Sequence, residues 1–175
     1  AALQTPEEEE TLTRVTQFVG RFADDATPES VCEWIDRGAG QTSDRFWTLD
    51  PVDGTKGFLR GDQYAIALAL IVDGQLQVGV LGCPNLSDGY RPDVDGPGSI
   101  LVASRGEGAW VTPLEAEPDF QRLHVSEQSD SAQARLLRSF ESGHTNVSQI
   151  DLLADEMEIE AAPVRMDSQA KYAVL

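Results

Sequence analysis

The amino-acid sequence predicts a layered α/β fold. Three observations support this prediction: apolar residues at helical spacing near the amino end, a hairpin of apolar strands at 64–81, and strands that alternate with helices from residue 122 onward. With 175 residues, of which 41% are hydrophobic, the chain can bury a core for one domain, or for one lobe and part of another.

The first two elements are expected to be helices. One begins at Pro6, with Thr5 as its N-cap and Glu8 closing a capping box. A second covers 28–37 and ends near Gly38. The apolar residues that follow the first capping box recur at helical spacing and are expected to form one buried face: Leu12, Val15, Val19 and Phe22.

A strand is expected next at 45–49, where β-forming residues gather. Pro51 biases Asp50 towards extended geometry and itself lacks a ladder donor, so the strand should stop with the carboxylate of Asp50 at its tip. If a turn through Pro51 and Val52 brings Asp53 back beside Asp50, the two carboxylates repel unless a cation lies between them. This spacing is the first indication of a metal site.

Local turn chemistry predicts the following strands. Residues 64–72 are almost continuously apolar, as in a strand buried on both faces, and Asp73-Gly74 then predicts a two-residue hairpin to a strand at 75–81. The stretch 84–98 is typical of a surface loop. The remaining elements are expected as strands at 99–103, 109–112, 122–125, 136–140 and 164–166, and as helices at 147–157 and from "DSQAKY" onward.

Composition limits the partners. The net charge of -17 excludes a nucleic-acid or anionic-membrane surface, because phosphate would be repelled almost everywhere on it. No apolar run reaches membrane-spanning length and no signal peptide is visible, although the chain opens with Ala1 and a removed targeting segment stays open. Cys32 and Cys83 lack metal or redox spacing, so two buried thiols in a reducing, cytoplasmic compartment are expected.

The stretch "DPVDGT" combines groups suited to phosphate chemistry. Asp50 and Asp53 supply hard carboxylate ligands of the kind that Mg²⁺ prefers, and the turn frees the carbonyl of Val52 as a third ligand. Gly54 lets backbone approach a ligand closely, and Thr55 offers a hydroxyl at the start of an expected helix, where amides favour an anion. A proline turn capped by Asp53 is the simpler alternative, but it does not account for these residues together.

The run "DPVDGTKGFLRGDQYAIALALIVDGQLQVGVLGCPNL" resembles the 3'(2'),5'-bisphosphate nucleotidases, within the magnesium-dependent, lithium-sensitive superfamily that includes inositol monophosphatase. The resemblance continues in "SFESGH" and "APVRMDSQAKYAVL". It implies part of an αβαβα sandwich, with mixed sheets and helices between them. It also implies that Asp50, the Val52 carbonyl and Asp53 hold Mg²⁺, with Asp50 bridging two ions, and that Thr55 acts with the two aspartates in catalysis by orienting the attacking water.

The same resemblance implies a substrate site formed by Gly54, Thr55, His144, Ser168 and Lys171. His144 would lie close to the adenine, whereas Ser168 and Lys171 would contact nucleotide and phosphate. The alternatives are a solvated loop histidine, a serine that only caps its helix, and an exposed helical lysine. For Lys171 we favour the phosphate contact, because the chain has only two lysines beside eleven arginines.

The resemblance also implies domain limits. Residues 1–118 would form most of an N-terminal metal-binding lobe that lacks its start, and 119–175 would begin a truncated C-terminal substrate-binding lobe. Such nucleotidases carry an acidic motif upstream of the position of Thr5 and a further aspartate downstream of the position of Leu175. We therefore expect an internal fragment that binds Mg²⁺ poorly and shows little turnover alone.

The reaction implied for the family is Mg²⁺-dependent hydrolysis of adenosine 3',5'-bisphosphate to AMP and phosphate. The sulfated nucleotide of sulfate assimilation, 3'-phosphoadenosine 5'-phosphosulfate, is the expected second substrate. One alternative is an inositol phosphate phosphatase, and another is a catalytically incomplete fragment that binds nucleotide or metal. The expected partner is a small-molecule nucleotide rather than nucleic acid or membrane.

Overall fold

The structure is a computed structural model that describes residues 2–86, 96–114, 117–140 and 147–174. The chain divides into two compact units, Ala1–Ser43 and Asp44–Leu175. This division differs from the lobe boundary expected near residue 118, which stays a prediction. Within the described ranges, every helix is too short or too polar to cross a membrane.

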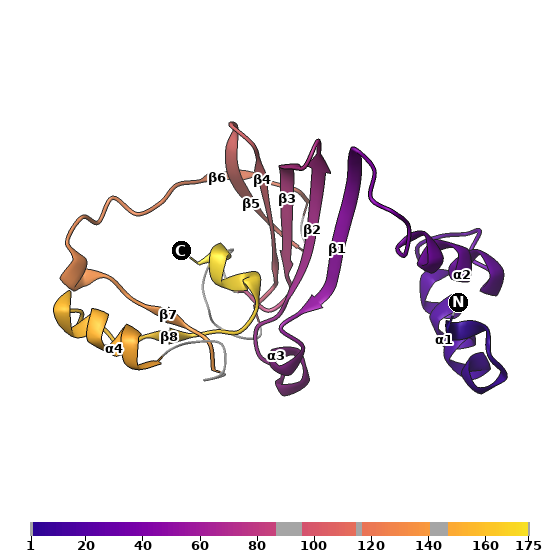
Figure 1. The fold of residues 1–175 in the computed structure, drawn as a ribbon, viewed down its shortest axis with the longest axis horizontal. Helices are drawn as coiled ribbons and strands as arrows, with labels where there is room; N and C mark the ends of the chain where they lie inside the picture. Colours follow the sequence, from indigo (N-terminus) through magenta and orange to yellow (C-terminus); the bar gives the residue numbers. More distant parts are fainter. Residues whose placement is uncertain (1, 87–95, 115–116, 141–146, 175) are drawn as a thin grey trace. The chain divides into compact units, whose positions relative to one another are not determined.

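The first unit is helical (Figure 1). It contains two short 3-10 turns, η1 (Ala2–Gln4) and η2 (Pro6–Glu8), and two helices, α1 (Glu9–Val19) and α2 (Pro28–Arg37). The predicted range of α2 is confirmed. Its start is fixed by a reciprocal cap, since the Thr27 side chain accepts from the Ser30 amide at 3.1 Å and the Ser30 hydroxyl accepts from the Thr27 amide at 2.8 Å.

The predicted start of α1 is wrong. The capping box between Thr5 and Glu8 does not form, because residues 6–8 make a 3-10 turn in which the Glu8 amide donates to the Thr5 carbonyl at 3.0 Å. A backbone hydrogen bond, and then the Thr5 side chain, lower the pKa of the Glu7 carboxyl. The expected apolar face is also incomplete, since Phe22 lies beyond the helix end and is 92% exposed.

The second unit is built on a six-stranded sheet in the order β1-β2-β3-β4-β5-β6, and all of its pairs are antiparallel. The mixed α/β class is confirmed. The strands are β1 (Arg45–Asp53), β2 (Ala65–Val72), β3 (Gln75–Cys83), β4 (Ser99–Ser104), β5 (Gly108–Pro113) and β6 (Gln121–Leu123). Helix α3 (Thr55–Arg60) lies between β1 and β2 in the chain.

The later elements are shorter than expected. The strand predicted at 136–140 contains only β7 (Leu137–Arg138), which pairs in parallel with β8 (Val164–Arg165). The strand predicted at 122–125 ends at Leu123 because pairing with β5 ends there. Three further helical elements lie in the part of the chain that the structure describes: η3 (Ser131–Gln133), α4 (Val147–Glu156) and η5 (Gln169–Ala173).

Two sheet predictions have opposite outcomes. The Asp73-Gly74 hairpin is confirmed, with φ values of 50° and 71° that suit a two-residue turn. Burial of β2 on both faces is wrong, because only Ala65 and Leu70 are buried and the rest of the strand is half-buried. Ala67 borders an open apolar groove rather than packed side chains.

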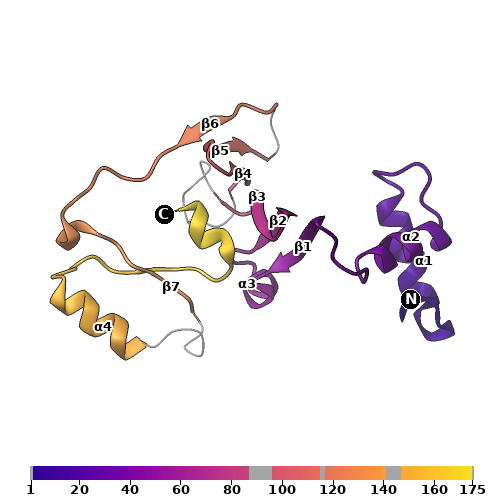
Figure 2. The same cartoon turned by 45° about the horizontal axis from the view of Figure 1, so that its top comes forward.

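The core lies where η5 packs against the sheet. Element η5 contacts β2 and β3, and Figures 1 and 2 show it beside them. Alternation along the strands places small and aliphatic side chains on the face beneath it. The buried cluster consists of Ala65, Cys83, Leu86, Leu101, Val111, Met166, Ala170 and Ala173. This packing brings the "DSQAKY" segment to the end of β1.

Candidate functional site

A β-bulge places the two aspartates of "DPVDGT" on one face of the sheet. The expectation that the strand stops at Asp50 is wrong, because β1 continues to Asp53. Asp50 pairs with Ala67 and Asp53 pairs with Ala65, so three steps along β1 match two steps along β2. The proline is tolerated because β1 is an edge strand. Asp50 and Asp53 therefore share a face although they are three residues apart.

The loop after β1 is folded by its own polar groups. The Asp50 carboxylate accepts from the Val52 amide at 3.2 Å, and the Thr55 hydroxyl donates to the Val52 carbonyl at 3.2 Å. Gly54 has φ 83° and caps the start of α3. A Cβ atom at Gly54 would lie 2.6 Å from the Cβ of Ser168, so only glycine fits this close approach.

The "DSQAKY" segment forms the opposite side of the site. The Gln169 amide donates to the Asp53 carboxylate, and the Ser168 hydroxyl accepts from the Ala170 amide at 3.2 Å. Ser168 therefore caps η5, as in the simpler of its two predicted roles. The Lys171 ammonium donates to the Ser139 hydroxyl at 2.8 Å. Lys171 is half-buried, so the alternative of an exposed helical lysine is wrong.

These two sides enclose a pocket of about 500 Å³. Asp53, Gly54 and Thr55 line one side of it, and Ser168 and Lys171 line the other. The lining also includes Lys56, Leu137, Ser139, Asp167 and Gln169. The structure thus brings together five of the residues that the sequence singles out.

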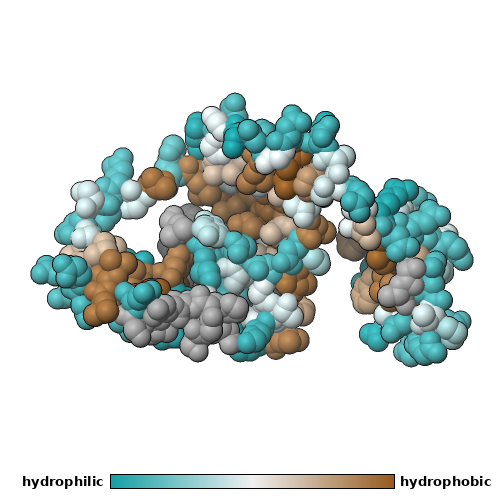
Figure 3. Space-filling view, viewed as in Figure 1, coloured by the Kyte–Doolittle hydropathy of each residue, from teal (hydrophilic) through white to brown (hydrophobic). Residues whose placement is uncertain are grey.

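Asp50, Val52 and His144 are not among the residues that line this pocket. Asp50 lines a neighbouring apolar groove of about 480 Å³, together with Gln169 and Tyr172. Figure 3 shows hydrophobic residues gathered over the sheet beside this groove. Gln169 borders both spaces and so connects Asp50 with the pocket. His144 lies outside the described residues.

Burial and neighbouring polar groups shift the pKa values of two groups near the pocket. Burial, and to a smaller extent the negative charge of Asp53, raise the pKa of the Cys83 thiol to about 12. This thiol stays protonated at neutral pH and belongs to the core. Hydrogen bonds to Asp62 and then to Asp167 raise the pKa of the Arg60 guanidinium further above its ordinary value.

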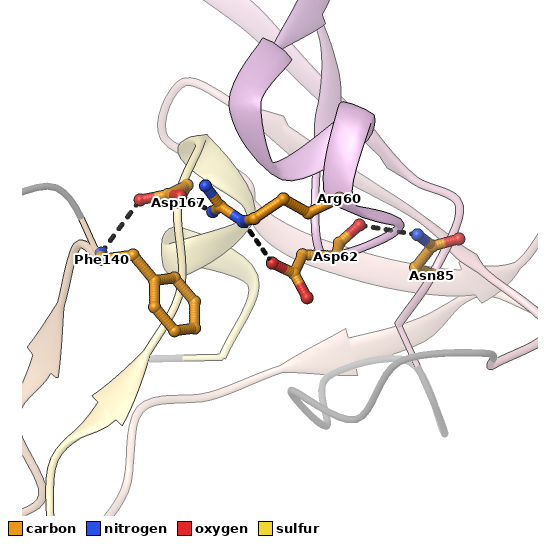
Figure 4. Close-up of polar contacts among 5 residues, drawn as sticks. All are labelled: Arg60, Asp62, Asn85, Phe140 and Asp167. Atoms are coloured by element: carbon orange, nitrogen blue, oxygen red, sulfur yellow. Dashed lines mark hydrogen bonds and ion pairs between the residues drawn. The ribbon is translucent and has the colours of Figure 1, made fainter.

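Sequence reasoning missed a polar network next to the pocket, which Figure 4 shows. Arg60 donates to the carboxylates of Asp62 and Asp167, and Asp167 also accepts from the Phe140 amide at 3.1 Å. The side-chain amide of Asn85 donates to the Asp62 carbonyl at 2.7 Å. Both residues lie in the sequence runs that carry the family resemblance, Arg60 in "GFLRG" and Asp167 in "DSQAKY". This position was the signal that could have identified them.

The arrangement suits a phosphate group and a hard cation. Asp53 and Lys171 line the pocket, and Asp50 lies in the neighbouring groove. Val52 lines neither space, but its carbonyl lies in the turn between the two aspartates and accepts from the Thr55 hydroxyl. Among the described residues, no three His, Cys, Asp or Glu side chains are grouped to hold a metal by themselves. A cation here would depend on the carbonyl, on water and on ligand oxygens.

Comparisons with known proteins agree with this chemistry. Residues 7–175 match the model of the Inositol monophosphatase family. A 3'(2'),5'-bisphosphate nucleotidase of Oryza sativa is 41% identical over 95% of this chain and 51% of its own length. The 3'(2'),5'-bisphosphate nucleotidase 1 of Arabidopsis thaliana is 36% identical over 95% of this chain and 52% of its own length.

A solved structure shares the fold of this chain. The structure of Mycobacterium tuberculosis SuhB aligns with a TM-score of 0.53 and 22% identity, over 91% of this chain and 59% of that one, which supports the fold alone. The chain spans about half the length of the curated relatives that it matches. Because the family match covers nearly all of the sequence, the chain belongs to the inositol monophosphatase family.

Proposed function

We propose that this protein hydrolyses the 3'-phosphate of adenosine 3',5'-bisphosphate, giving AMP and phosphate. One observation carries the proposal: a single pocket has Asp53 and Thr55 on one side and Ser168 and Lys171 on the other. The names of the relatives, which are 3'(2'),5'-bisphosphate nucleotidases at 36 to 41% identity, support a nucleotide over other phosphate esters. The activity is a proposal because the chain spans about half of those relatives.

The donor set fits Mg²⁺ in chemistry. Asp50 and Asp53 each use one carboxylate oxygen in a backbone hydrogen bond, which leaves the second oxygen of each able to serve as a ligand. The Val52 carbonyl accepts one hydrogen bond and has a second lone pair. Mg²⁺ is commonly held by one or two carboxylates together with water and substrate phosphate oxygens. When bound, the metal supplies a water of lowered pKa and neutralises charge on the leaving oxygen.

The chain's own residues bind and orient the phosphate in this proposal. The Lys171 ammonium, fixed by Ser139, offsets phosphate charge across the pocket. The Ser168 hydroxyl accepts from the Ala170 amide, so its own proton is free to be donated to a phosphate oxygen. The Thr55 hydroxyl donates to Val52, and its lone pairs can accept a hydrogen bond from an attacking water.

The test is Mg²⁺-dependent binding of adenosine 3',5'-bisphosphate to the 175-residue chain, measured by calorimetry, with phosphate release measured in parallel. Asp53→Asn should weaken the Mg²⁺-dependent binding by at least about tenfold, because an amide replaces a charged ligand. Asp73→Asn is the matched control, since it makes the same change at an exposed hairpin turn. Binding that ignores both Mg²⁺ and Asp53→Asn would contradict the proposed site.

Substrate choice is tested with the same chain. Inositol 1-phosphate is the competing ligand, because the matched family is named for it. Tighter binding or faster hydrolysis of inositol 1-phosphate would replace the nucleotide proposal with the inositol one. We extend the proposal to 3'-phosphoadenosine 5'-phosphosulfate, which offers the same 3'-phosphate. Because the chain alone is expected to show little turnover, the relative affinity decides between the two ligands, and phosphate release decides whether the chain is an incomplete fragment that only binds nucleotide.

We also propose a reducing, cytoplasmic compartment. Cys32 and Cys83 are both buried free thiols, which agrees with a compartment that keeps cysteines reduced.

A further inference from the structure

The side chain of Asp167 is the meeting point of three segments of the second unit (Figure 4). One carboxylate oxygen accepts from the Arg60 guanidinium at the end of α3, and the other accepts from the Phe140 amide just after β7. Only 10% of this side chain is exposed. The guanidinium of Arg60 also lies over the ring of Phe140, 5.2 Å from its centroid. One buried carboxylate thus ties together parts of the chain that are distant in sequence.

Each segment that Asp167 holds carries a residue of the pocket. Phe140 follows Ser139, whose hydroxyl accepts from the Lys171 ammonium at 2.8 Å. Asp167 itself directly precedes Ser168. Helix α3, which ends at Arg60, begins in the loop that carries Asp53. Asp167 therefore links both segments of the Lys171 and Ser168 side of the pocket with the helix that begins next to Asp53.

The backbone of Ser168 needs such support. Its φ of 69° and ψ of 173° lie in a region that is essentially restricted to glycine. A side-chain-bearing residue stays there only when its neighbours over-determine its position. Asp167 anchors the segment on one side of Ser168, and the bond between the Gln169 amide and Asp53 anchors it on the other.

Asp167 lines the pocket, where a carboxylate could contact metal or phosphate directly. Both of its oxygens already accept hydrogen bonds, one of them from a guanidinium. The charge of the carboxylate is already paired with the Arg60 guanidinium, and a phosphate would be repelled by it. The geometry is that of a support for neighbouring residues.

We propose that Asp167, held by Arg60, is a positioning residue that keeps Ser168 and Lys171 facing the Asp53 loop so that the pocket can bind a phosphate group. The part concerning phosphate rests on the proposed function. The part concerning position does not, because it is a statement about how three segments are held in the protein without ligand.

The experiment uses the 175-residue chain with Asp167→Asn. This change keeps the shape of the side chain but replaces one acceptor oxygen with an NH₂ donor, so one of the two hydrogen bonds, to Arg60 or to Phe140, is lost. Asp62→Asn is the matched control, because it removes the other carboxylate partner of Arg60 at an exposed pair of little energetic weight. Arg60→Lys tests whether a guanidinium is needed to bond both carboxylates, since a single ammonium replaces its two separate donors.

Amide hydrogen exchange is followed by NMR at Phe140 and Gln169, with Leu70 of β2 as a reference for global opening. Binding of inorganic phosphate in the presence of Mg²⁺ is measured in parallel by calorimetry.

We expect Asp167→Asn to speed exchange at Phe140 and Gln169 by about tenfold or more, with a much smaller change at Leu70. Phosphate affinity should fall by a similar factor, whereas Asp62→Asn should change neither measurement by more than about twofold. Arg60→Lys should reproduce a part of both losses.

Three results would overturn the inference. Unchanged exchange at Phe140 and Gln169 in Asp167→Asn would show that the carboxylate does not hold the segments. Equal acceleration at Leu70 would assign it a role in global stability alone. Faster local exchange with unchanged phosphate affinity would separate the network from the pocket. If the unmodified chain binds no phosphate, the proposed function fails together with the phosphate part of the inference, while the exchange rates still decide the positional part.

Discussion

Replacing Gly54 with alanine tests whether the two sides of the pocket are packed as closely as the structure shows. Gly54 has φ 83°, and a Cβ atom there would lie 2.6 Å from the Cβ of Ser168. Gly61, at the other end of the same helix, has φ 76°, but a Cβ atom there would have no atom within 4 Å. The two glycines therefore share the backbone requirement and differ in the contact.

The expected losses of stability differ accordingly. A residue with a Cβ in the left-handed region costs about 1–2 kcal/mol, and both variants pay this amount. Two carbon atoms prefer a separation of about 3.5–4.0 Å, so Gly54→Ala must also push Ser168 away by roughly 1 Å. Overpacking of this kind costs about 1–3 kcal/mol. The free energy of unfolding should therefore fall by about 2–5 kcal/mol in Gly54→Ala and by about 1–2 kcal/mol in Gly61→Ala.

Urea unfolding followed by far-ultraviolet circular dichroism gives both values. Because both substitutions lie in the second unit, any separate contribution of the first unit cancels in the comparison. Equal losses in the two variants, or a larger loss in Gly61→Ala, would refute the close approach of Gly54 to Ser168. Gly54→Ala should in addition weaken Mg²⁺-dependent nucleotide binding, and Gly61→Ala should not.

Three further predictions concern single groups. The pKa of Cys83 is raised from 9.0 to about 12, so the buried thiol contributes stability that is complete below pH 9 and is lost as the pH rises towards 12. Alkylation located by peptide mass spectrometry should be slow at Cys83 in the folded chain at pH 9 and fast in urea, and equally fast modification in both would contradict this burial. Thr27→Ala should remove the reciprocal cap of α2 and lower the free energy of unfolding of the first unit by about 1 kcal/mol. The urea midpoint of that unit measures this loss, and an unchanged midpoint would contradict the stabilising role of the cap. Lys171→Met should weaken phosphate binding and reduce its salt dependence in calorimetry at two ionic strengths, because the opposing positive charge is lost. An unaltered salt dependence would place Lys171 away from the phosphate.

Elements fixed by short-range chemistry could be predicted from the sequence. Asp73-Gly74 specifies its hairpin because both residues accept positive φ, and the turn then sets the pairing of the flanking strands. Helix α2 was delimited by Pro28 at its start and Gly38 after its end. The loop containing Asp53 could be proposed as a ligand site because residue type alone identifies oxygen donors.

Features that depend on tertiary position could not be predicted. Pro51 favours the end of a strand by local preference, yet the strand continues because β1 lies at the sheet edge and a bulge absorbs the extra residue. The pairing of Arg60 with Asp167 could not be predicted either, because the sequence contains 30 acidic residues and 13 basic ones. The spacing of Thr5 and Glu8 is that of a capping box, but residues 6–8 form a tighter 3-10 turn in which the Glu8 amide bonds the Thr5 carbonyl.

The separation in sequence of the two sides of the pocket has a consequence for folding. Asp53 and Gln169 are 116 positions apart, and Arg60 and Asp167 are 107 apart. Closing a flexible loop of that length costs about 4 kcal/mol of chain entropy, whereas the hairpin between β2 and β3 closes over two residues. The sheet should therefore form early and the pocket late, a sequence of events that pulsed hydrogen exchange at Leu70 and Gln169 during refolding would time. During synthesis on the ribosome, the loop with Asp53 would emerge and fold well before the segment that completes it, so ligand capture must wait until residues 167–171 have left the exit tunnel.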